Sequence, residues 1–217
     1  MYIQLSNTKL YYECFGTGKP IIMLHGNGED SSIFDKTAKK LAVNHMVYLL
    51  DSRNHGKSEK HPKNHYADMA DDVVEFINDL GIDKPILYGF SDGGIIGVLI
   101  AVGNGNILSK LIVSGVNLKP SGMKFGTVLG IIFEYLFKRD VNTLMMLKEP
   151  HIKAQDLKNI SVPTVVIAGE HDVIRKRHTY MIAKNIPNSE LVIVKGENHG
   201  SYIVHSDKLY DILIRYI

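Results

Sequence analysis

The stretch PILYGFSDGGIIGVLIAV (85–102) holds a short apolar run, a glycine-rich turn and a longer apolar run. The first run is typical of a buried strand and the second of a buried helix. Between them lies Gly89-Phe90-Ser91-Asp92-Gly93, a G-x-S-x-G pattern in the strand–turn–helix setting where it forms a sharp turn. Glycine serves where neighbouring backbone leaves no room for a Cβ. We therefore predict that this segment, the nucleophile turn, presents Ser91 as a nucleophile.

Two other interpretations of the nucleophile turn were weighed. A glycine-rich turn with an incidental serine would need no partner residues elsewhere in the chain. A phosphate-binding loop fits less well, because no Gly-Lys-Ser/Thr follows the glycines.

Working outward, six further apolar runs rich in Val, Ile, Leu and Tyr precede or follow this stretch. Most are continuous, as in strands covered on both faces of a parallel sheet. Helical patterns lie between them, including residues 66–80, which Gly81 is placed to end, and residues 209–216. This alternation predicts an α/β fold with a mostly parallel sheet flanked by helices. The six runs are KLYYECF (9–15), PIIMLH (20–25), HMVYLLD (45–51), KLIVSG (110–115), PTVVIAG (163–169) and ELVIVKG (190–196).

The alternation is interrupted at residues 117–161, which we name the cap segment. Two helical patterns, at roughly 123–138 and 140–148, stand there between successive strands, where connections are usually much shorter. We predict an α/β core at 1–116 and 162–217 and a small helical cap at 117–161. Because ligands bind outside the carboxyl ends of parallel strands, the cap segment should lie over that crevice.

Composition narrows the class of protein. The 217 residues carry 25 Lys or Arg and 23 Asp or Glu, a net charge of +2. This balance predicts no attraction to nucleic acid or anionic membrane. Cys14 is the single cysteine, so no internal disulfide or thiolate metal cluster is expected. The first residues do not resemble a signal peptide and no apolar stretch reaches about 18 residues, so we expect neither a secretory leader nor a membrane span. We expect a cytoplasmic monomer or homodimer.

A serine nucleophile needs a general base, which in turn needs an orienting acid. In this strand–helix setting the chain order is Ser, acid, His. The turn after VVIAG contains Asp172, and the turn after LVIVKG contains His199. Both turns follow strands at their carboxyl ends, so we predict Asp172 as the acid and His199 as the base.

Other residues compete for these roles less strongly. His171 and His205 are alternative bases, and Glu170 is an alternative acid. His205 is expected inside the last helix. The remaining histidines after or between the motifs are expected to be surface or connector residues: His45, His61, His65, His151 and His178.

Acyl transfer also needs hydrogen-bond donors for the oxyanion. The backbone N–H of Asp92 directly follows the nucleophile. The loop HGNG (25–28) follows another strand, and its glycines allow close approach, so we choose the N–H of Asn27 as the second donor. His25 is expected to fix that loop through a hydrogen bond.

Five stretches in a fixed order resemble the α/β-hydrolase family: FGTGKPIIMLHGNG (15–28), DSRNHGKS (51–58), GFSDGG (89–94), GEHD (169–172) and GENHG (196–200). The resemblance implies an eight-stranded sheet and no metal or organic cofactor. It also implies the Ser91, Asp172 and His199 roles, with Asn27 and Asp92 as oxyanion amides. DSRNHGKS departs from the family pattern D-x-R-G-x-G-x-S at Asn54 and His55. Its Asp51 and Arg53 are expected to be structural.

Within the family, YGFSDGGIIGVLIAV (88–102) and KLIVSGVN (110–117) are similar to the biphenyl-hydrolase-like, valacyclovirase-type branch. In that branch the Asp after the nucleophile is implicated in recognising a substrate amino group. Asp92 could take that role, or could simply place negative charge at a helix N-terminus.

These observations predict a serine hydrolase that cleaves carboxylic esters of small to medium, partly apolar substrates through an acyl-enzyme. Amino-acid esters are one candidate group of such substrates. Thioesterase, lactonase, C–C hydrolase and perhydrolase activities use the same residues. A non-catalytic ligand-binding receptor is the alternative of another class. The apolar residues of the cap segment are more often core than substrate contacts. The expected recognition residues are Asp92, Phe90, Met123, Phe133 and Met145.

Overall fold

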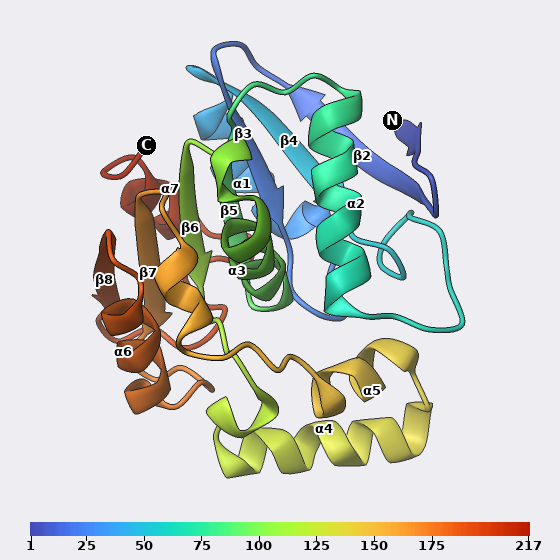
Figure 1. The fold of residues 1–217 in the computed structure, drawn as a ribbon, viewed down its shortest axis with the longest axis vertical. Helices are drawn as coiled ribbons and strands as arrows, with labels where there is room; N and C mark the ends of the chain where they lie inside the picture. The colour runs from blue at the N-terminus through green and yellow to red at the C-terminus, as the bar shows by residue number, and fades with distance from the viewer.

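The computed structural model describes all 217 residues and contains one eight-stranded sheet (Figure 1). Its strand order is β1-β2-β4-β3-β5-β6-β7-β8. The pairs β1–β2 and β2–β4 are antiparallel, and all other neighbouring strands are parallel. The predicted mostly parallel sheet is therefore confirmed.

The strands are β1 (Tyr2–Gln4), β2 (Lys9–Phe15), β3 (Lys19–Leu24), β4 (His45–Asp51), β5 (Ile86–Phe90), β6 (Lys110–Ser114), β7 (Thr164–Gly169) and β8 (Ser189–Val194). The α-helices are α1 (Asp35–Leu41), α2 (Tyr66–Asp79), α3 (Asp92–Asn104), α4 (Phe125–Lys138), α5 (Val141–Lys148), α6 (Lys176–Asn185) and α7 (Lys208–Leu213).

Each apolar run that predicted a strand forms one, with small differences at its ends. The eighth strand, β1, was not marked by such a run, because it is only three residues long and pairs at the edge of the sheet. The predicted helix at 66–80 is α2, and Gly81 follows its end with a φ of 60°. The C-terminal helix is shorter than expected, since α7 ends before Tyr216.

Two apolar layers cover the sheet. On one face α2, α3 and α6 pack over a cluster of 30 buried residues, and on the other α1 and α7 pack over a cluster of 18. Because both faces are covered, the central strands are apolar throughout rather than alternating. All five residues of β5 are buried, for example.

The cap segment contains α4 and α5, which lie beyond the carboxyl ends of β6 and β7 at the bottom of Figure 1. Met145 of α5 belongs to the larger core cluster, whereas Ile131 of α4 packs in a small separate cluster with Met123 and Ile174. The helix α5 is thus integrated with the sheet layers, and α4 is the outermost element. None of the helices is both long and apolar enough to span a membrane.

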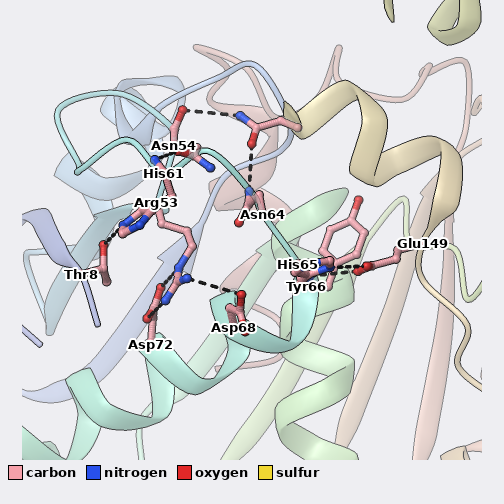
Figure 2. Close-up of polar contacts among 11 residues, drawn as sticks. Thr8, Arg53, Asn54, His61, Asn64, His65, Tyr66, Asp68, Asp72 and Glu149 are labelled. Atoms are coloured by element: carbon pink, nitrogen blue, oxygen red, sulfur yellow. Dashed lines mark hydrogen bonds and ion pairs between the residues drawn. The ribbon is translucent and has the colours of Figure 1, made fainter. Parts of the chain in front are cut away.

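The connection between β4 and α2 is held by a buried ion pair (Figure 2). Arg53 donates from Nε and Nη2 to the two carboxylate oxygens of Asp72, at 2.6 and 2.5 Å. Both side chains are at most 8% exposed, and Asp68 lies 3.5 Å from Nη1. Arg53 thereby fixes the segment after β4 against α2, in agreement with its expected structural role.

The same connection holds the cap segment to the core. Asn64 donates to the Oδ1 of Asn142 in α5 at 2.8 Å. Glu149, just after α5, accepts from the backbone N–H of Tyr66 at 3.2 Å and lies 2.6 Å from Nδ1 of His65 (Figure 2). These contacts set the position of α5 relative to the start of α2.

Asp72→Asn should destabilise the protein by about 2–4 kcal/mol, because it leaves the buried Arg53 guanidinium without its main counter-ion. Urea unfolding would measure the change. The exposed neighbour Asp71→Asn is the matched control and should shift stability by less than about 0.5 kcal/mol. Equal stabilities of the two variants would contradict the importance of the pair.

Candidate active site

Ser91 occupies the sharp turn between β5 and α3, with φ 52° and ψ −112°. Its N–H donates to the carbonyl of Ser114 at 2.8 Å, which fixes the turn to the neighbouring strand β6. A Cβ on Gly93 would lie 2.3 Å from the carbonyl oxygen of Leu24, and one on Gly89 would lie 2.2 Å from that of Gly93. The two glycines of the nucleophile turn are therefore required by close backbone packing, as predicted.

Ser91, His199 and Asp172 lie in one hydrogen-bonded row. Nε2 of His199 is 3.1 Å from Oγ of Ser91, and Nδ1 is 2.8 Å from Oδ1 of Asp172. The same Oδ1 accepts the N–H of Ile174 at 2.9 Å, which orients the buried carboxylate. Ser91 and the imidazole remain partly exposed.

The neighbouring strands β7 and β8 bring the acid and the histidine together. Their turns touch directly, since His171 N–H donates to the carbonyl of Glu197 at 2.9 Å. A Cβ on Gly169, the last residue of β7, would lie 2.3 Å from the Asn198 carbonyl. Residues 27 positions apart in the sequence therefore meet at one edge of the sheet.

The competing residues lie outside this row. His171 is exposed, and Glu170 accepts the N–H of Gly196 at 2.8 Å. His205 precedes α7 instead of lying within it, and its Nδ1 is 2.9 Å from Oδ1 of Asp35. The expected helical position of His205 was wrong, because the chain turns there with a φ of 48°.

One histidine expected at the surface is buried. His178 lies in α6, and its Nε2 accepts the N–H of Leu118 at 3.0 Å. Burial lowers the pKa of His178 to about 4, which suits a neutral acceptor. The side chain thus links α6 to the start of the cap segment, a long-range contact without a local sequence pattern.

The loop after β3 lies against the nucleophile turn, because Gly93 N–H donates to the carbonyl of His25 at 3.1 Å. His25 Nδ1 is 2.7 Å from the Gly26 carbonyl, and Nε2 accepts from Ser52 N–H at 3.0 Å. Burial lowers the pKa of this imidazole to about 4. His25 therefore fixes the loop, as expected.

The two amides predicted for the oxyanion are free of intramolecular acceptors. Asn27 N–H donates to no protein group. Asp92 is the first residue of α3, where helix geometry leaves the N–H without a carbonyl partner. His55, at a variable position of the family pattern, places Nε2 3.2 Å from Oδ1 of Asn27. Asn54 takes the place of the family glycine with a φ of 66°, a conformation that asparagine tolerates.

The Asp92 carboxyl points into the protein. It is 2% exposed, and Tyr66 Oη donates to its Oδ1 at 2.8 Å, while Oδ2 has no partner. Burial raises the pKa of Asp92 to about 7, against the hydrogen bond from Tyr66. In the sequence, Tyr66 stands out only as part of the apolar face of a helix. A tyrosine on such a face commonly carries its hydroxyl to a buried partner, and that was the available signal.

Two further residues of the site had no sequence signal. Glu29 accepts the N–H of Gly26 at 3.0 Å, and its burial raises the pKa of its carboxyl. Gly115, just after β6, lies beside the imidazole of His199: a Cβ there would be 2.6 Å from Cε1. The approach of Gly115 to His199 joins segments that are distant in the sequence, whereas Gly26 and Glu29 lie three residues apart in one loop.

The residues expected to recognise substrate differ in how deeply they are buried. The ring of Phe90 is buried, with its centroid 4.9 Å from that of His199. Met123 and Met145 are buried in core clusters, whereas Phe133 is half exposed on α4. Instead of Met145, the next residue contacts the loop after β3: Met146 Sδ lies 2.8 Å from Nδ2 of Asn27.

A cavity of about 460 Å³ opens beside Asn27, a size typical of small-molecule sites. It lies between the loops after β3 and β4 and the junction of α4 with α5. Its lining contains no hydrophobic residue, which differs from the partly apolar surface expected of the cap segment. The lining includes Asn27, Glu29, His55, Lys60, Lys138 and Asn142.

The family assignment follows from these features and from the similarity of the chain to known proteins. A family model described as the alpha/beta hydrolase fold matches residues 19–139, more than half of the chain. The chain therefore belongs to the α/β-hydrolase family, as its motifs implied. Curated relatives include esterases and lipases, so the family is one of hydrolases.

Individual relatives are distant. An sn-1-specific diacylglycerol lipase of Danio rerio is 34% identical over 121 residues, which cover 54% of this chain and 38% of that protein. The chain thus spans about two fifths of that relative. A Bacillus subtilis AB hydrolase superfamily protein, YisY, is 24% identical over 95% of this chain and 94% of its own. Among solved structures, an esterase from Exiguobacterium antarcticum is 23% identical and superposes with a TM-score of 0.87, covering 99% of this chain and 98% of that one.

Gly115→Ala should slow the labelling of Ser91 by a fluorophosphonate probe by about 100-fold, because the new Cβ displaces the imidazole of His199. Labelling kinetics would measure this. Gly81→Ala is the matched control: its φ of 60° resembles the 64° of Gly115, but a Cβ there meets no atom within 4 Å. Equal labelling rates in the two variants would show that the contact with His199 does not matter.

Asp92 should make stability depend on pH. Because its folded-state pKa is about 7 rather than 3.8, folded protein still holds a proton that the unfolded chain has released between these values. Stability therefore falls as pH rises through this window. The Asn side chain of Asp92→Asn stays neutral. The free energy of unfolding of this variant, relative to that of the parent protein, should therefore rise by roughly 1–3 kcal/mol from about pH 5 to about pH 8. Denaturant unfolding at both pH values tests this, and parallel pH responses would contradict it.

Proposed function

We propose that the protein is a serine hydrolase that cleaves carboxylic esters of small to medium size through an acyl-enzyme. The observation that carries the proposal is the row formed by Ser91 Oγ, the His199 imidazole and the Asp172 carboxylate, with distances of 3.1 and 2.8 Å. A nucleophile, a base and an orienting acid within hydrogen-bond reach are the arrangement that activates a serine hydroxyl.

In the proposed reaction, Ser91 Oγ attacks the ester carbonyl while His199 Nε2 takes the hydroxyl proton. The N–H groups of Asn27 and Asp92 bind the developing oxyanion. His199 then gives the proton to the departing alcohol, which leaves the acyl group on Ser91. Water then attacks this ester while His199 takes its proton, and His199 returns that proton to Ser91 Oγ as the acid leaves. Asp172 holds the ring and stabilises its charged form throughout.

The surroundings of the loop after β3, which contains Asn27, favour a polar group on one side of the ester. The cavity beside Asn27 is lined by charged and amide side chains, which suit a hydroxylated alcohol better than a long alkyl chain. A preference for amino esters does not follow from the geometry. The Asp92 carboxyl is 2% exposed and accepts a hydrogen bond from Tyr66, so the residues that cover it would have to move before a substrate ammonium group could reach it.

Ser91→Ala should reduce the turnover of short p-nitrophenyl esters by at least about 1000-fold, since the acyl-enzyme can no longer form. A fluorophosphonate probe should label the parent protein at Ser91 and leave the variant unlabelled. Spectrophotometric turnover and intact-mass measurement provide the two readouts.

Ser109→Ala, an exposed serine far from the nucleophile turn, is the control and should keep full turnover and labelling. Labelling of Ser91 without turnover of any ester would indicate a ligand-binding protein. A folded protein that is neither labelled nor able to turn over any ester would contradict the roles assigned to the three residues. Turnover of thioesters or lactones in preference to esters would support the roles of the three residues but contradict the proposed substrate class.

A further inference from the structure

The helix α4 carries a broad apolar face that nothing in the protein covers. Phe125 and Phe137, near its two ends, are 75% and 86% exposed. The face is continuous because its members recur at intervals of three and four residues. It consists of Phe125, Leu129, Ile132, Phe133, Leu136 and Phe137, and all six side chains are exposed.

The inner side of α4 accounts for its attachment to the protein. Ile131 is the single buried residue of the helix, and Val128 packs with it against the small cluster of Met123 and Ile174. On the outer side, a Cβ added at Gly126 or Gly130 would meet no atom within 4 Å. An exposed apolar patch of this extent marks an interaction surface rather than ordinary surface composition.

The segment that contains α4 carries more positive charge than the rest of the protein. Residues 117–161 carry seven Lys or Arg and four Asp or Glu, a net charge of +3. The other 172 residues carry 18 and 19, a net charge of −1. Exposed cations stand at both ends of α4, with Lys124 before it and Arg139 after it, while Lys138 pairs with Glu134 of the same helix at 2.8 Å.

We propose that α4 docks the protein on an anionic lipid surface. The six-residue apolar face would enter the headgroup region while Lys124 and Arg139 contact anionic headgroups, as in helices that lie in a membrane interface. Long basic side chains can keep their charges at headgroup level beside a buried apolar stripe. The overall charge of +2, from which we expected no attraction to membranes, averages over two parts of opposite sign.

Docking through α4 would bring the candidate active site near the lipid surface. Glu134 and Lys138 of α4 line the polar cavity together with Asn27, whose N–H is the proposed oxyanion donor. A polar headgroup linked to an ester could enter that cavity from the interface. The docking itself does not depend on the proposed ester hydrolysis and can be tested without it.

A second copy of the chain is the competing occupant of the face. A symmetric contact through α4 would bring two segments of charge +3 together, and like charges facing each other oppose association. Anionic lipid matches both the apolar face and its basic surroundings, so the charge distribution favours lipid over a homodimer.

Co-sedimentation with vesicles tests the proposal. The protein should bind phosphatidylcholine vesicles that contain roughly 30 mol% phosphatidylglycerol, and bind pure phosphatidylcholine vesicles at least about tenfold more weakly. The double variant Phe125→Ser, Phe137→Ser should bind the anionic vesicles at least about tenfold more weakly than the parent protein. Added salt should also weaken binding.

The matched control is Val43→Ser, an apolar residue 74% exposed in the turn between α1 and β4, at the opposite end of the parallel strands from α4. It should bind like the parent protein. The urea unfolding midpoint should be unchanged in both variants, which separates loss of docking from loss of folding. Absence of vesicle binding by the parent protein, or equal binding of neutral and anionic vesicles, would overturn the proposal. So would a dimer in sedimentation velocity that the double Phe variant abolishes.

Discussion

The close approach of the nucleophile turn to the end of β3 is the constraint on which the site depends. Gly93 lies so near the Leu24 carbonyl that no side chain fits between them, and its N–H bonds the carbonyl of His25. This contact holds Ser91 in its left-handed conformation, with φ 52°. It also places the loop with Asn27 beside the start of α3. One backbone contact therefore positions both Ser91 and the two free amides.

The acid and the histidine depend on the order of strands at the other side of the site. Because β6, β7 and β8 are adjacent and parallel, the turns that follow them end at the same edge of the sheet. Gly115 after β6 leaves room for the imidazole of His199, and Asp172 after β7 orients it. The proposed chemistry is thus a property of neighbouring strand ends, while the cap segment supplies the surroundings: a polar cavity on one side and the apolar face of α4 on the other.

Much of this arrangement could be predicted from local patterns. Continuous apolar runs mark the central strands, because burial on both faces requires apolar side chains at every position. The glycines of the nucleophile turn are recognisable because close backbone packing in that turn leaves no room for a Cβ. The strand β1 escaped because three residues at a sheet edge leave almost no pattern. The buried position of His178 and the hydrogen bond from Tyr66 to Asp92 escaped because each joins two distant segments.

The sequence by itself determined the fold class, the nucleophile turn and the order of Ser91, Asp172 and His199, because periodicity and steric demands act over a few neighbouring residues. Only the tertiary structure decided that the Asp92 carboxyl is buried against Tyr66, that a polar cavity adjoins Asn27 and that the apolar face of α4 is left uncovered. The same apolar residues could have formed core, and the same net charge could have been evenly spread. Which side chains are buried, and where charges gather, is settled when distant segments pack together.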